Sequence, residues 1–202
     1  MSDKSAPPPQ KEPAKKKVFL SASRIDTYLN CSALYWARYH LKVPDTGNDG
    51  ARRGSVAHEV LEILLNKRHK HIYDAAIQHD CCTEVPALWR LILRFAKRFG
   101  VDDKKNLKMI EGFIMTGLKN EFFGPSNTVR VEAEKEFSLE IDKPELGIKY
   151  LARGFIDKSV FICEGDEAKI KTCDYKSSKE KFEGEKEAFN IQAMLYQNAL
   201  RY

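Results

Sequence analysis

The period of the hydrophobic residues changes near residue 128, and this change limits the folds that the chain can adopt. Before it, apolar residues recur at helical spacing, most clearly in residues 88–99 and 107–122, as on the buried face of a packed helix. After it, apolar and polar residues alternate through residues 129–141, as in a half-buried strand. Helical spacing returns after about residue 185. This order of helices, strands and a closing helix predicts a mixed α/β (α+β) domain.

The ends of the individual elements follow from local signals. Ser23, with Asp26 three places on, predicts the N-cap of a first helix, and a second helix is expected from about Arg52. Residues 71–83 carry no clear pattern, whereas Pro86 suits the first turn of a helix. After the first strand and a turn, an antiparallel meander is predicted with strands at residues 148–157, 158–163 and 168–176.

Length and composition favour one folded domain behind a short tail. A chain of 202 residues with 43% hydrophobic residues can bury one good core. Residues 1–17 hold prolines and lysines without apolar anchors, so a disordered tail is expected there. The domain is expected to span residues 18–202, with a helical part at about 20–124, a strand core at about 128–176 and a closing helix at about 185–202. The chain stops without a helix-ending signal, as it would if the natural domain continued.

The charge is concentrated in the tail. Five lysines and two acids there contribute +3 of the net charge of +5, which leaves about +2 for residues 18–202. Nucleic-acid binding would therefore need a local patch. The five cysteines show no CxxC spacing, as expected for reduced thiols inside a cell. No apolar run approaches the ~20 residues of a membrane span, so a cytoplasmic protein without membrane contact is expected.

Two acids and a lysine near the end of the strand core form a candidate metal site. Asp157 and Asp174 are 17 positions apart, which fits adjacent strands joined by a turn. Two close carboxylates repel each other unless a cation is bound, and their oxygens suit Mg²⁺ or Mn²⁺. Lys176 lies on the same side of its strand as Asp174, where it could assist a metal-bound water. Taken alone, Asp-x-Lys is so common that a solvated acid and base at a strand end would be the favoured interpretation.

Four short motifs in a fixed order extend this site. They are Gly54-x-x-x-His58, Gly154-Phe155-Ile156-Asp157, Asp174-Tyr175-Lys176 and Gln192-x-x-x-Tyr196. The ordered set resembles the RecB-like branch of the PD-(D/E)XK nuclease superfamily, which includes CRISPR-associated and phage exonucleases. The resemblance covers nearly all of the chain from Val18 onward and implies a restriction-endonuclease-like core.

The resemblance also implies the roles of the central residues. His58, Asp157 and Asp174 would be metal ligands, the Tyr175 backbone carbonyl would add another, and Lys176 would be the catalytic lysine. They would hold one or two Mg²⁺ or Mn²⁺ ions.

Four further residues receive roles around this centre. Gln192 and Tyr196, one helical turn apart, would contact the scissile phosphate or hold the site together. Gly54 would let its helix approach the strands closely. Glu134 is a weaker candidate acid, because it lies on a polar strand face that also carries Glu132 and Glu136. For Glu134, an exposed acidic face is at least as good an interpretation.

The function implied by the resemblance is metal-dependent hydrolysis of DNA, by an exonuclease of DNA repair, recombination or phage DNA processing. Its substrate would be single- or double-stranded DNA with ends, in a prokaryotic or phage-infected cell, and a helicase, recombinase or single-strand-binding protein would be a candidate partner. The alternative is a non-catalytic nucleic-acid-binding or assembly module with the same fold. Some relatives hold an iron–sulfur cluster with one cysteine before the core and three after it. Cys31 stands at the first position, but no cysteine follows Cys173, so no cluster is expected.

Overall fold

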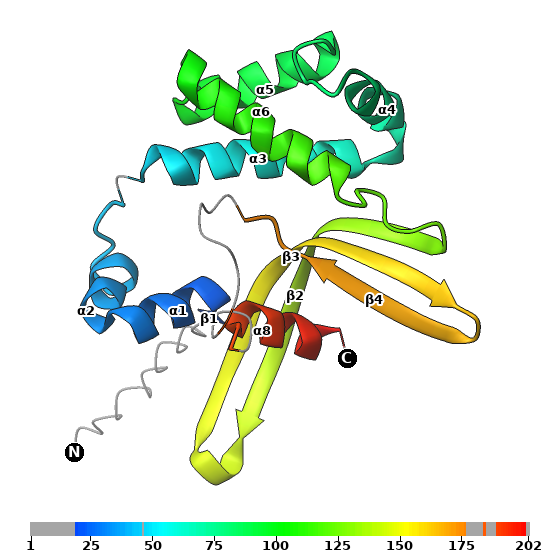
Figure 1. Ribbon diagram of the computed structural model, residues 1–202. Helices are drawn as coiled ribbons and strands as arrows, with labels where there is room; N and C mark the ends of the chain where they lie inside the picture. Colours follow the sequence, from blue (N-terminus) through cyan, green and yellow to red (C-terminus); the bar gives the residue numbers. More distant parts are fainter. Residues whose placement is uncertain (1–18, 46, 177–183, 185–188, 201–202) are drawn as a thin grey trace, which may run out of the picture.

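The computed structural model describes residues 19–45, 47–176, 184 and 189–200. The tail expected at residues 1–17, and both ends of the closing helix expected at 185–202, lie outside these residues. A layer of helices packs over one end of a twisted, four-stranded mixed sheet, and further helices pack near its middle (Figure 1). This arrangement confirms the predicted mixed α/β fold.

The sheet is built around one long strand. Its strands are β1 (Phe19–Leu20), β2 (Thr128–Lys143), β3 (Ile148–Glu164) and β4 (Glu167–Cys173). β2 pairs with β3 in antiparallel fashion along most of the length of both strands. On the other side of β3, β1 pairs in parallel at residues 151–152 and β4 pairs in antiparallel fashion at residues 158–164.

The predicted strand break after Asp157 is wrong, because β3 runs through it without interruption. Lys158, the residue after Asp157, is buried, and its ammonium lies 3.4 Å from the carbonyl oxygens of Glu121 and Phe122. These carbonyls follow the end of a helix and provide acceptors for the charge. Asp157 therefore lies inside a strand, between Ile156 and Lys158, which both pair with β2.

The helices agree with the sequence pattern in most places. They are α1 (Ala22–Asn30), α2 (Ser32–Tyr35) with a π turn (Trp36–His40), α3 (Asp49–Leu65), α4 (Lys70–His79) after a 3₁₀ turn (Lys67–His69), α5 (Pro86–Phe99), α6 (Lys104–Lys119) and α8 (Ile191–Ala199). A 3₁₀ turn (Pro144–Leu146) joins β2 to β3.

Three local predictions about the helices need correction. The N-cap of α1 is Ser21 rather than Ser23, because the Ser21 hydroxyl accepts the Arg24 backbone N–H. The first helix is also interrupted at Cys31, which has an extended backbone. α4 forms in the stretch without a clear pattern: Ala76 is buried, and Ile72, Tyr73 and Ala75 are partly buried against the larger core, so tertiary packing stabilises this helix.

Two hydrophobic cores hold these layers. The larger core joins α3, α4, α5 and α6, and α3 contributes six buried residues to it. The smaller core lies where α1 and α8 meet the sheet, around Phe137, Ala152 and Ile156. α3 is fixed by the first core and lies against β2, so its remaining face is presented to the strands. Among the described residues, no helix is long and apolar enough to cross a membrane.

Candidate metal and catalytic site

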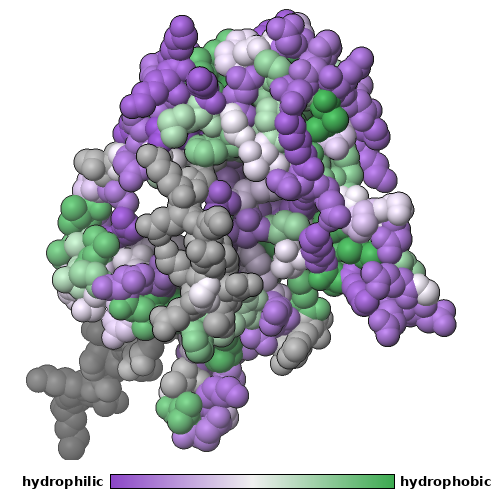
Figure 2. Space-filling model, viewed as in Figure 1, coloured by the Kyte–Doolittle hydropathy of each residue, from purple (hydrophilic) through white to green (hydrophobic). Residues whose placement is uncertain are grey.

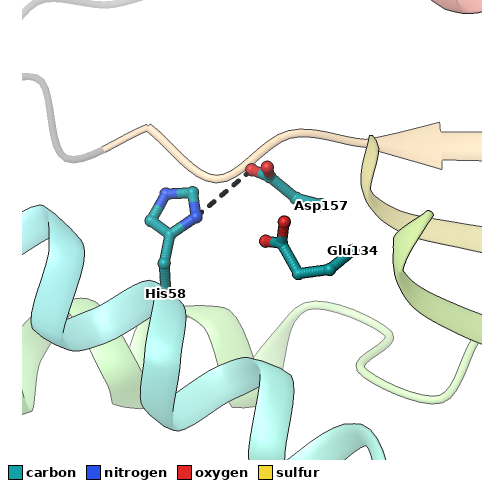
Figure 3. A group of neighbouring side chains, drawn as sticks. All are labelled: His58, Glu134 and Asp157. Atoms are coloured by element: carbon teal, nitrogen blue, oxygen red, sulfur yellow. Dashed lines mark ion pairs between the residues drawn. The ribbon is translucent and has the colours of Figure 1, made fainter. Parts of the chain in front are cut away.

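Three side chains from three elements converge where α3 approaches the sheet. His58 comes from α3, Glu134 from β2 and Asp157 from β3, and Figure 3 shows their polar ends pointing toward one another. One ligand atom of each lies within 4.8 Å of the others, and all three side chains are half-buried. A ring nitrogen and two carboxylates at such spacing form a donor set suited to a divalent cation.

The histidine ring is oriented by a backbone group. Its Nε2–H donates to the Tyr175 carbonyl at 2.8 Å, and its Nδ1 lies 3.5 Å from Asp157 Oδ2. The Nδ1–Asp157 contact is an ion pair if the ring is protonated (Figure 3), whereas in the neutral ring the Nδ1 lone pair faces a carboxylate, which is unfavourable unless a cation lies between them. A histidine that gives its other N–H to a backbone carbonyl is the usual arrangement of a metal ligand. The residues present therefore fit a metal ion bound through Nδ1.

The Tyr175 backbone contributes to the site in two ways. Its carbonyl, predicted as a further metal ligand, is engaged by His58 in this arrangement. Its N–H donates to Asp157 Oδ2 at 2.8 Å. Tyr175, a single residue that follows β4, therefore fixes both His58 and Asp157.

Glu134 reaches the cluster through an unusual backbone conformation. Its φ of 45° lies in the left-handed region, which is rare for residues other than glycine. The β2–β3 pairs on either side are Ala133 with Lys158 and Lys135 with Ile156, and Glu134 has no such pair. Strained backbone of this kind concentrates at functional sites. Glu134 is thus half-buried in the cluster instead of lying on an exposed acidic face.

Both carboxyl groups of the cluster are unfavourably placed for negative charge. Burial is the largest cause that raises the pKa of Asp157, and the nearby Asp174 raises it further. Burial also raises the pKa of Glu134, with added contributions from Asp157 and from Glu62 and Glu59 on α3. Glu59 and Glu62 line a neighbouring cavity of about 570 Å³ together with the cluster. A divalent cation would remove this repulsion.

Glu59 and Glu62 are not among the site residues predicted from the sequence. The signal for Glu62 was its position four residues after His58, which places it on the same helix face. Gly54, one turn before His58, is buried and lines the same cavity.

Asp174 lies beside the cluster but has other partners. The register of β3 and β4 pairs Lys158 with Cys173, so the next position brings Asp174 alongside Asp157. Asp174 Oδ1 accepts from Gln192 Nε2 at 2.6 Å, and Oδ2 pairs with Lys176 Nζ at 2.6 Å. One carboxylate oxygen of Asp174 is therefore held by Gln192 and the other by the predicted catalytic Lys176.

A hydrogen-bond chain connects Lys176 to the sheet. Lys176 Nζ donates to Gln192 Oε1 at 2.9 Å, and Gln192 Nε2 contacts the Tyr196 hydroxyl. That hydroxyl donates to the Phe155 carbonyl at 2.7 Å, on the side of β3 between its pairings with β1 and β4. Tyr196 is only 4% exposed. Of the two roles implied for Gln192 and Tyr196, this geometry favours holding the site together.

Gly154 provides a test of how closely this region is packed. A Cβ atom there would lie 2.8 Å from Cζ of Phe137, whose ring packs edge-on against Tyr196. We expect Gly154→Ala to lower the free energy of unfolding by about 1–3 kcal/mol through overpacking, measured by urea denaturation. Gly112→Ala is the matched control: nothing lies within 4 Å of the added methyl group in α6, so this variant should be neutral or more stable. Equal destabilisation by both changes would contradict this account.

Among the comparisons with known proteins, one gives a match. A family model described as the PD-(D/E)XK nuclease superfamily matches residues 19–202. No curated protein and no solved structure matches the chain significantly.

Proposed function

This chain belongs to the PD-(D/E)XK nuclease superfamily, and we propose that it is a Mg²⁺- or Mn²⁺-dependent DNA exonuclease of the RecB-like branch. Membership implies a nucleic-acid substrate and hydrolysis of phosphodiester bonds, typically with divalent metals. The assignment to the RecB-like branch rests on the order of the four motifs, from Gly54-x-x-x-His58 to Gln192-x-x-x-Tyr196. A role in DNA repair, recombination or phage DNA processing, beside a helicase, recombinase or single-strand-binding protein, follows from the same resemblance.

The observation that carries the proposal is the orientation of His58. Its Nε2–H is committed to the Tyr175 carbonyl, and its Nδ1 faces the carboxylates of Asp157 and Glu134. His58, Glu134 and Asp157 would hold a divalent ion, which, when bound, lowers the pKa of a water molecule and offsets charge on the phosphate. Asp174 adds negative charge beside Asp157 and fixes the lysine.

The protein's own groups have separate parts in the reaction. The Lys176 ammonium is positioned by Asp174 and Gln192 and would stabilise the negative charge that develops on the phosphate oxygens. The Tyr175 N–H keeps the Asp157 carboxylate directed at the cluster. Tyr196 and Gln192 prevent the lysine and Asp174 from moving apart.

Cleavage of linear DNA tests the proposal directly. Purified protein with Mn²⁺ should shorten end-labelled linear DNA, single- or double-stranded, and EDTA should stop the reaction. Closed circular DNA of the same sequence should resist, because an exonuclease requires an end. An absence of cleavage at enzyme excess would contradict the nuclease proposal. Cleavage of the circle would contradict exonucleolytic action alone.

A further inference from the structure

A second cavity lies on the lysine side of the site. It has a volume of about 800 Å³ and is lined by residues of α1, of α8, of β3 and by Phe137 of β2. Lys176 and Gln192 contribute to its wall, as do the phenyl rings of Phe155 and Phe189. The cavity therefore opens beside the group proposed to stabilise the reacting phosphate.

The two phenyl rings are unusually exposed for their position. Phe155 is 50% exposed and Phe189 is 73% exposed, and neither belongs to a hydrophobic core. Phe155 stands two residues before Asp157 on β3, so both side chains lie on one face of the strand, about 7 Å apart along it. Phe189 lies three residues before Gln192. Two uncovered aromatic faces next to a catalytic group are expected to contact a ligand.

The polar part of the wall suits a phosphodiester chain. Ser21, Ser23 and Asn190 line the cavity at the starts of α1 and α8, where backbone N–H groups favour anions. Among the described lining residues, Lys176 is the basic side chain and Asp26 is the acidic side chain. Since one acidic side chain offsets one basic side chain among these described residues, binding is inferred from the exposed rings and not from charge.

We propose that this cavity receives unpaired nucleotides of the DNA substrate, with bases stacked on Phe155 and Phe189 and the scissile phosphate at Lys176. This rests on the proposed function and specifies its substrate as a single strand. A side chain can stack on a base only when the face of that base is not covered by its neighbours, as in single-stranded or frayed ends. In an intact duplex, the neighbouring bases cover both faces.

Binding measured without cleavage tests the proposal. Fluorescence anisotropy of labelled oligothymidylate, titrated with the full chain in EDTA, reports affinity while catalysis is stopped. Phe155→Ala and Phe189→Ala should each weaken single-strand binding by about 5- to 100-fold, and affinity for blunt duplex should change little. Trp36→Ala is the matched control, because Trp36 is similarly exposed, at 55%, and lies outside the cavity wall. It should change the affinity less than twofold.

A leucine variant separates base stacking from general apolar contact. Phe155→Leu keeps an apolar side chain but removes the π face, so it should bind single strands as weakly as Phe155→Ala. A strand carrying 2-aminopurine should show quenched fluorescence with the native chain and recovery with Phe155→Leu. Full affinity in the leucine variant, or an equal loss in Trp36→Ala, would overturn the proposal.

The two proposals can fail independently. If Mn²⁺ supports cleavage but neither phenylalanine variant weakens single-strand binding, the stacking cavity is wrong and the nuclease stands. If single-strand binding depends on both rings but no cleavage occurs with Mn²⁺, the cavity is upheld and the nuclease proposal fails.

Discussion

Lys176→Ala is expected to reduce DNA cleavage by about 10²- to 10³-fold or more while leaving DNA binding and stability largely unchanged. The Lys176 ammonium is held by Asp174 Oδ2 at 2.6 Å and Gln192 Oε1 at 2.9 Å. Because the side chain is 52% exposed, its removal leaves no cavity and should change the free energy of unfolding by less than about 0.5 kcal/mol. Single-turnover cleavage with Mn²⁺ and anisotropy in EDTA measure the two effects separately.

Lys171→Ala is the matched control for this prediction. Lys171 lies on β4 with a side chain that is 53% exposed, and it pairs with Glu121, away from the hydrogen-bond chain of Lys176. It should retain cleavage close to that of the unaltered protein. If Lys176→Ala keeps more than half of the cleavage rate, or if both lysine variants lose cleavage equally, Lys176 is not the catalytic lysine.

The sheet shows which parts of this fold are readable from local pattern. Alternation predicted β2, and the separation of Asp157 and Asp174 by 17 positions predicted neighbouring strands, as the β3–β4 register confirms. Alternation did not reveal that β3 continues past Asp157. That continuity depends on Lys158 finding carbonyl acceptors after α6, which is a contact between distant parts of the chain.

The site was harder to predict from the sequence, because it too depends on contacts between distant parts of the chain. The pattern assigned Glu134 to a polar strand face, but its left-handed φ and its approach to His58 depend on how closely α3 lies against the sheet. The alternation along a strand predicts which face of the sheet a side chain lies on, but it does not predict which helix packs over that face. The hydrogen bond between His58 and the Tyr175 carbonyl likewise joins residues 117 positions apart, and no short motif contains that information.

Mn²⁺ is expected to raise the melting temperature of the protein, and Asp157→Asn is expected to abolish this shift. At a concentration of 100 times its Kd, a ligand adds about 2.7 kcal/mol to stability. For a chain of this size, that corresponds to about 5–10 °C. Asp157 supplies a carboxylate to the cluster with His58 and Glu134, so its neutral amide should bind the ion far more weakly. Differential scanning fluorimetry with and without Mn²⁺ measures the shift.

Without metal, Asp157→Asn is expected to raise the melting temperature of the protein. Burial and the charge of Asp174 raise the pKa of Asp157 on folding, so above the unfolded pKa its ionised form destabilises the fold. In EDTA at neutral pH, Asp157→Asn should therefore melt higher than the unaltered protein, and the difference should shrink as falling pH protonates Asp157. Glu136→Gln, an exposed change on β2 two residues from Glu134, should keep the full Mn²⁺ shift. A metal shift that survives in Asp157→Asn, or that is lost equally in Glu136→Gln, would exclude this cluster as the metal site.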